Sequence, residues 1–157
     1  MTVSSDITAA LAARIGTVTT AAGYASNIAK VFYPLNNADY QPMGADLQPQ
    51  DMPAVIVYQG PVKVEPVHSL NNMYATYYLE VVQPWVPDAT MWQVVSDISK
   101  ALWGGAFDAT ENSAFRFHPS VVEPKLVEVV PDFGMLQGHR IWVIVLLVHY
   151  RVRYTNL

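Results

Sequence analysis

The sequence predicts an α+β domain with a mostly antiparallel sheet and two main helices packed on one face. Two observations carry this prediction. Segments with a strand-like period of two follow one another directly, and only one helical pattern lies between them. A second helical pattern opens the chain. With 157 residues and no internal repeat, the chain is expected to form a single domain over residues 1–157.

In the first half, apolar residues spaced by three or four predict a helix that starts at Ser4–Asp6 and reaches Val18. Strands are expected to follow, with a turn at 59–61 and an irregular, proline-containing loop at about 35–53. Loops of that length within one domain are usually functional or mobile. The four expected strands are 28–33, 53–58, 62–67 and 73–83.

In the second half, Asp88 is placed to cap a helix, because a carboxylate is favourable at a helix N-terminus. This helix is expected to end at Gly104–Gly105, with Asp97 on its outer side. Its predicted buried stripe is Met91, Val94, Val95, Ile98 and Leu102. A short extended piece at 115–118, a strand at 121–130, a turn at 131–134 and a final strand at 139–154 complete the pattern.

The final strand is unusually long. At about 3.3 Å per residue, sixteen residues span roughly 53 Å, whereas a compact sphere of this chain length is roughly 39 Å across. From Trp142 on, its even positions are apolar, and its odd positions change to His149, Arg151 and Arg153 near the end. We therefore expect the strand either to curl with its sheet or to reach another subunit.

The composition is apolar and poor in charge. Hydrophobic residues make up 52% of the chain and charged residues 14%, where about a quarter is typical. Charges cover the surface of such a chain sparsely, so some apolar surface is expected to be covered by other chains. A well-buried monomer with a surface of Ser, Thr, Asn and Gln is the alternative.

Residue usage disfavours several classes of function. A net charge of −4 with scattered basic residues argues against a nucleic-acid-binding domain. The absence of cysteine excludes disulfides, thiolate zinc sites and thiol catalysis. The first residues lack the pattern of a secretory signal, and the longest apolar run, Ile141–Val148, is too short to span a bilayer. We expect a protein made and used in the cytoplasm, with no membrane partner.

No arrangement of residues indicates catalysis. The histidines lack the spacing of a metal site, and no serine lies in a nucleophile elbow. Gly104–Gly105 follows a helix, whereas a phosphate-binding loop precedes one. Glu123 and Glu128 fall on opposite faces of their strand because their separation is odd. The sequence therefore predicts no enzyme, no catalytic or metal site and no cofactor.

Polar and aromatic residues of the strands favour protein contacts. The stripe of His149, Arg151 and Arg153 can meet phosphate, or it can pair with the loop residues Asp39, Asp46 and Asp51 of a neighbouring subunit. Tyrosines such as Tyr74 can stack on bases, but in an acidic protein sheet packing or a protein interface is the favoured role.

The order of features resembles a family. A short N-terminal helix is followed by a polar loop, the segment Asp51–Val57, a strand at Tyr77–Val82 and an amphipathic helix from Asp88. The chain closes with the strand ending His149–Tyr154. This layout resembles the tail terminator (tail completion) proteins of long-tailed bacteriophages, including the lambda-type terminator and related minor tail proteins, over nearly the whole chain.

The resemblance implies a structural virion protein that forms a hexameric ring at the head-proximal end of the tail, assembled in the bacterial host cytoplasm. Such a ring sits on the tail tube protein, ends tube polymerisation and meets a neck or connector protein, while genomic DNA only passes through its lumen. A neck or head–tail joining protein is the alternative, and an enzyme or small-ligand binder is a third, disfavoured one. The residues expected at subunit, tube or neck interfaces are Asp39, Asp46, Asp51, Met52, Lys63, His68, His149, Arg151 and Arg153, within loop 36–52, segment 62–72 and the final strand.

Overall fold

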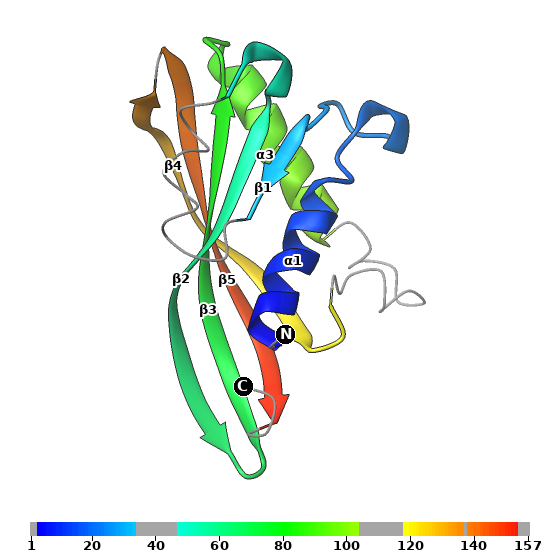
Figure 1. Cartoon of the computed structure of the whole chain (residues 1–157), viewed down its shortest axis with the longest axis vertical. Coiled ribbons are helices and arrows are strands. Elements are labelled where there is room, and N and C mark those ends of the chain that lie inside the picture. The colour runs from blue at the N-terminus through cyan, green and yellow to red at the C-terminus, as the bar shows by residue number, and fades with distance from the viewer. Residues whose placement is uncertain (1–2, 34–46, 104–117, 137, 154–157) are drawn as a thin grey trace.

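The computed structural model describes residues 3–33, 47–103, 118–136 and 138–153. A five-stranded sheet of order β1-β2-β3-β5-β4 forms one layer, and both long helices cover one of its faces (Figure 1). β1 runs parallel to β2, and the other three pairings are antiparallel. The predicted fold class is confirmed. The elements are α1 (Val3–Ile15), η1 (Thr20–Ala22), β1 (Lys30–Phe32), η2 (Pro49–Asp51), β2 (Ala54–Val67), β3 (Leu70–Gln83), α3 (Asp88–Trp103), β4 (Val121–Leu136) and β5 (His139–Arg153).

The core lies between the helices and the sheet. Alternate residues of β3 point towards the helices, and so do the even-numbered residues of β5, as their period of two predicts. All five stripe residues predicted for α3 are buried, and burial of each such side chain stabilises the fold by roughly 1.5–3 kcal/mol. The fully buried members include Ile7, Leu11, Ile15, Tyr77, Leu79, Met91, Trp142, Ile144, Leu146 and Tyr150.

The first helix is shorter at its end than predicted. α1 begins at Val3 and ends at Ile15 rather than at Val18. Val18 is nevertheless fully buried, because the turn after Gly16 carries it back onto the core, where its carbonyl accepts from the Ile28 amide at 2.9 Å. The apolar spacing identified a core residue correctly but assigned it to the wrong element.

The turn predicted at 59–61 is wrong, because β2 is one strand from Ala54 to Val67. Gln59 pairs with Tyr77 and Val62 pairs with Ala75, so two residues of β2 oppose one residue of β3. This is a β-bulge, in which proline is tolerated because the extra residue leaves the ladder. Glycine and proline at 60 and 61 therefore marked a bulge within a strand and not a reversal of the chain.

The turn predicted at 131–134 is also part of a strand. β4 continues to Leu136, and its pairing with β5 shifts register between Val130 and Gly134. Asp132 adopts a left-handed backbone with φ +47° at this shift, a conformation that aspartate tolerates better than most residues. The predicted glycine cap at 104–105, the extended piece at 115–117 and the loop residues 35–46 lie outside the described residues.

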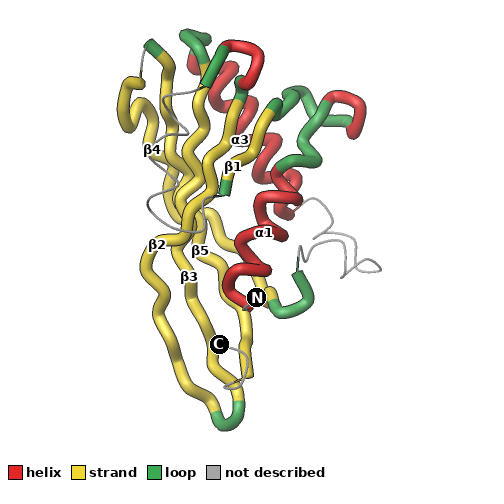
Figure 2. The backbone as a smooth tube through the Cα atoms, viewed as in Figure 1, coloured by secondary structure: helices red, strands yellow, loops and turns green. Residues whose placement is uncertain are grey.

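The molecule is elongated along its strands (Figures 1 and 2). β5 stays paired with β3 from Arg140 to Arg153, and β2 and β3 have 14 residues each. The long strand therefore does not outrun its domain, because its neighbours are nearly as long and the domain is not spherical. The end formed by Val62–Asn72 and Arg151–Arg153 extends beyond α1 (Figure 2), and we call it the finger.

Candidate assembly surfaces

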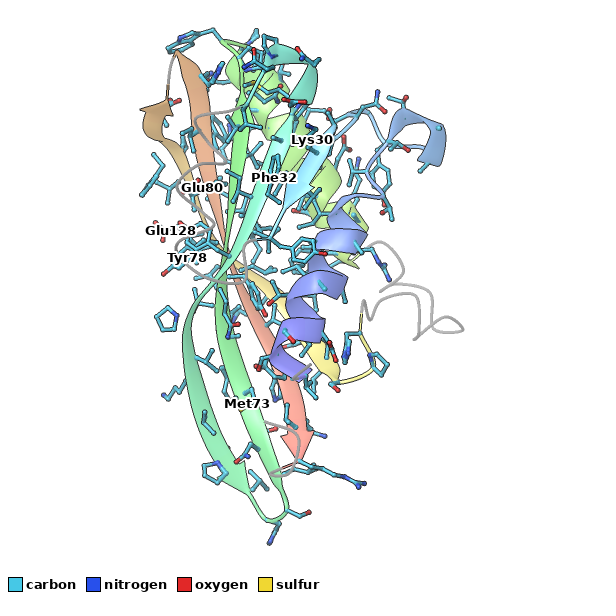
Figure 3. The ribbon with its side chains drawn as sticks, in the orientation of Figure 1. Lys30, Phe32, Met73, Tyr78, Glu80 and Glu128 are labelled. Atoms are coloured by element: carbon cyan, nitrogen blue, oxygen red, sulfur yellow. The ribbon has the colours of Figure 1, made fainter. Side chains whose placement is uncertain are left out.

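The sheet face opposite the helices is partly open. Near the start of β2, a second apolar cluster covers it, built from Leu47, Met52, Ala54, Ile56 and Val82. Further along the strands the face carries Tyr78, Glu80 and Glu128 (Figure 3). Glu80 is buried and accepts a hydrogen bond from the Tyr58 hydroxyl at 3.3 Å. In the middle of this face, side chains of the sheet therefore hydrogen-bond to one another.

Two residues predicted to meet partners lie at the start of β2. Met52 is buried in the second apolar cluster. Asp51 accepts from the Gln48 amide at 3.0 Å and pairs with Lys30 Nζ at 3.0 Å. The Gln48 amide and then Lys30 hold the pKa of this carboxyl below its ordinary value. Asp51 is therefore already paired within its own chain, and the predicted partners Asp39 and Asp46 lie outside the described residues.

A polar cluster occupies the open face at the base of the finger and just before it. His149 stacks on Tyr74 with ring centroids 4.6 Å apart, and its Nε2 lies 3.1 Å from Asn72 Oδ1. Arg151 Nε donates to the same oxygen at 3.2 Å. Lys63 stands opposite Tyr74 on β2. The sequence predicted His149 and Arg151 as one stripe and Lys63 as a separate interface residue, and the pairing of β2, β3 and β5 places Lys63 on the same row as His149.

Burial and the neighbouring Arg151 lower the pKa of His149. The imidazole is therefore harder to protonate than an ordinary histidine, since desolvation and a nearby cation both disfavour its charged form. Arg151, Arg153 and Lys63 are exposed and carry the positive charge of this region.

The tip of the finger gathers two further predicted residues. His68 turns the hairpin with φ +52°, and Arg153 pairs with Leu70 beside it. Asp51 and Met52 precede β2 whereas His68 follows it, and the 14 residues of β2 span about 46 Å. Those predicted interface residues that the structure describes thus form two groups at opposite ends of the molecule, and not one surface.

The sequence did not predict an aromatic cluster at the end opposite the finger. Arg140 lies at its centre and is only 6% exposed. Its guanidinium donates to both carboxylate oxygens of Asp132 at 3.0 and 2.9 Å, pairs with Asp88 at 2.7 Å and bonds the Val86 carbonyl at 2.9 Å. The hydrogen bond to Asp88 is the main reason that the pKa of Arg140 is raised.

Aromatic rings surround this guanidinium. Arg140 lies 5.4 Å from the centroid of Trp85 and 5.5 Å from that of Trp142, within the range of cation–π attraction. Trp92 meets Trp142 edge to face at 4.9 Å. Trp85 and Trp92 are 65% and 48% exposed, and Phe133, next to Asp132, is 61% exposed. We call Trp85, Trp92 and Phe133 the aromatic end. In the sequence, the signal for this cluster was Trp92, which lies outside the predicted buried stripe of the helix.

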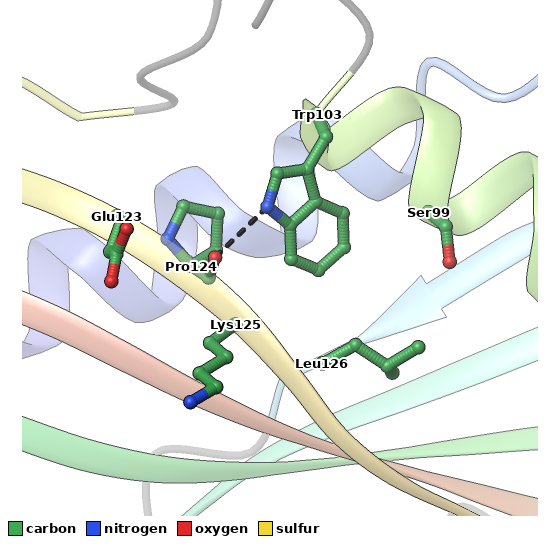
Figure 4. Close-up of a pocket in the computed structure, with 6 residues that line it drawn as sticks. All are labelled: Ser99, Trp103, Glu123, Pro124, Lys125 and Leu126. Atoms are coloured by element: carbon green, nitrogen blue, oxygen red, sulfur yellow. Dashed lines mark hydrogen bonds between the residues drawn. The ribbon is translucent and has the colours of Figure 1, made fainter.

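A hollow of about 490 Å³ lies between α3 and β4 (Figure 4). The Trp103 indole donates to the Pro124 carbonyl at 2.9 Å and fastens the end of α3 to β4. Ser99 and Glu123 lie on opposite sides of this hollow (Figure 4), so they do not form a nucleophile and base pair. No group of three or more potential metal ligands occurs among the residues that the structure describes.

The comparisons with known proteins concern the fold. No family model matches the chain, and no curated protein matches it. Among solved structures, the chain is similar to one described as "Virion of native gene transfer agent (GTA) particle", with a TM-score of 0.50 and 14% sequence identity. The match covers 90% of this chain and 84% of that one. Within the described residues, no helix is both long and apolar enough to cross a membrane.

Proposed function

We propose that this chain is a structural protein of a tailed phage or phage-like particle, and that it forms a ring which caps the tail tube, ends its polymerisation and joins it to the neck. The observation that carries the proposal is the fold: two helices on one face of a long, mostly antiparallel sheet. A chain of a gene transfer agent virion matches this fold over 90% of the present chain, and the order of elements resembles that of tail terminators.

The surfaces support assembly more than chemistry. The exposed arginines of the finger and the exposed tryptophans of the aromatic end are residue types that are enriched at protein interfaces. Asp51 and Arg140, whose pKa values are shifted, form ion pairs within the chain at separate places. The pKa shifts of Tyr77, His149 and Tyr150 come mainly from burial. We infer a non-enzymatic role, with the ring itself, the tube protein and a neck protein as partners.

Light scattering of the purified protein, at low and at physiological salt, tests the ring. We expect a particle of about six copies, each of 17.4 kDa, with an open centre in negative-stain images. A mass of one copy at every salt and protein concentration would contradict a preformed ring.

A charge reversal tests the contact. Replacing Arg151 and Arg153 with Glu should reduce the particle mass, because both side chains are exposed at the finger and are proposed to meet an adjacent subunit. Lys125→Glu is a matched control, since Lys125 is an exposed cation on β4 outside the finger. An unchanged mass for the double variant would remove these arginines from the contact. A neck or head–tail joining role is distinguished by adding preformed tubes: a terminator binds tube ends, whereas a joining protein does not.

A further inference from the structure

The two edges of the sheet are poorly suited to strand addition. Among the described residues, β1 pairs only with Ala54–Ile56, so the rest of β2 has no neighbouring strand on that side. That part of β2 carries Pro61, Pro66 and a bulge. β4, the other edge, carries two prolines and three register shifts. Prolines and bulges are the features that prevent edge strands from pairing with other chains, so subunits are expected to meet through side chains.

Exposed apolar side chains concentrate at the two ends of the molecule. Nine large hydrophobic residues are exposed in the part of the chain that the structure describes, and six of them lie at the ends. The finger exposes Val64, Val67 and Leu70, and the opposite end exposes Trp85, Trp92 and Phe133. Val67 pairs with Leu70, whereas Val64 points to the other sheet face because its separation from Val67 is odd. Both faces of the finger therefore present aliphatic groups.

The charges at the two ends are opposite in sign. Lys63, Arg151 and Arg153 surround the apolar pair of the finger, with Glu65 as the acidic residue among them. At the aromatic end, the carboxylates of Asp88 and Asp132 remain 73% and 56% exposed although both bind Arg140. Because Arg140 is buried beneath them, the surface presented to a partner is aromatic with an acidic margin.

We propose that the finger of one copy docks on the aromatic end of the next copy, an inference that rests on the proposed ring. Aliphatic side chains pack against indole rings, and the cations of the finger meet the carboxylates at the margin. The two surfaces differ, so the contact is heterologous, and its repetition generates a closed ring or a filament rather than a two-fold dimer. The network around Arg140 holds the tryptophans in place before docking, which reduces the entropy lost on binding.

Cysteine cross-linking tests the contact directly, because the chain has no cysteine of its own. Val67→Cys and Phe133→Cys are prepared as separate proteins, mixed, assembled and oxidised. We expect a disulfide-linked dimer in this mixture. Val127→Cys replaces Phe133→Cys in the control mixture, since Val127 is 57% exposed on β4 outside both surfaces. The control mixture is expected to give at least tenfold less dimer.

Each outcome decides the proposal. A ring that assembles without the cross-link, or with equal cross-linking in the control mixture, overturns the end-to-end contact and leaves the ring function standing. A dimer formed by Val67→Cys alone shows a symmetric contact and also overturns it. Single-copy mass in every mixture contradicts both the contact and the proposed ring. As a second measurement, Trp85→Ser should abolish assembly while Val127→Ser preserves it, and the circular dichroism of both variants should match that of the unaltered chain.

Discussion

Replacement of Gly60 by alanine should destabilise the fold through one close contact. A Cβ at position 60 would lie 2.4 Å from Cε2 of Tyr78, 3.2 Å from Cδ2 of the same ring and 3.3 Å from the Thr76 carbonyl oxygen. The first distance is far below van der Waals contact, so the ring must move. Its displacement disturbs the packing of Tyr78 against Tyr58, whose ring centroids are 5.3 Å apart.

The expected size of the effect is a difference of two opposing contributions. Overpacking of this kind destabilises the folded state by about 1–3 kcal/mol. The reduced entropy of the unfolded chain after Gly→Ala offsets about 0.4–1 kcal/mol of this loss. The free energy of unfolding should therefore fall by up to about 2.6 kcal/mol; the middle of both ranges gives about 1.3 kcal/mol, which lowers the Tm by about 3–5 °C in a chain of this size. Chemical denaturation followed by tryptophan fluorescence measures the free energy.

Gly16→Ala is the matched control. The nearest atom to its added Cβ is the Ala13 carbonyl oxygen at 3.4 Å, so this variant should be as stable as the original chain or slightly more stable. The double variant Gly60→Ala, Tyr78→Ala should show a smaller penalty for the glycine change than the single variant, because the obstructing ring is gone. A Gly60→Ala protein that is more stable than the unaltered chain, or a double variant in which the penalty of the glycine change is not reduced, would refute the steric reasoning.

Three other measurements test the interior and the finger. Asp97→Ala should cost about 1–3 kcal/mol in a denaturation experiment, because the fully buried carboxylate accepts from the Ser26 amide at 2.8 Å and that donor would lose its partner. Burial raises the pKa of Tyr77 to about 12, so the folded state keeps a proton that the unfolded state loses above pH 10. Stability present below pH 10 should fall up to pH 12, and Tyr77→Phe should reduce that loss by up to about 2.7 kcal/mol. In an NMR titration, His149 should protonate below the ordinary histidine range, and Arg151→Gln should raise its midpoint; a midpoint at or above the ordinary value would contradict the buried setting.

The sequence predicted correctly the parts of the fold in which buried residues recur with a regular period. The alternation in β3 and β5 placed nearly every core residue on the correct face, since a strand under two helices must bury one side. The errors arose where proline or glycine was interpreted as a turn. At 59–61 and 131–134 a bulge uses the same residues as a reversal, and only pairing with the neighbouring strand distinguishes the two.

The candidate surfaces were predicted only in part. The stripe of His149 and Arg151 followed from residues two apart on one strand, but Lys63 joined it through cross-strand register, which the sequence does not show. Asp97 was expected outside the α3 stripe and is fully buried, because the segment after η1 supplies the Ser26 amide as its partner. The aromatic end depends on Arg140 meeting residues from three other segments.

The bulge in β2 separates a half of the strand that must pack in the core from a half that forms the exposed finger. Before it, Val55 and Val57 face the helices; after it, the extra residue resets the alternation so that Lys63 and Glu65 face the open side. Which residues of the finger face the open side is therefore independent of the alternation in the buried half of β2. Insertion of paired residues at the tip of the hairpin, beside His68, would lengthen the finger without moving the core side chains of β3, such as Met73 and Ala75. A lineage of such proteins can follow changes in its partners by altering this one hairpin.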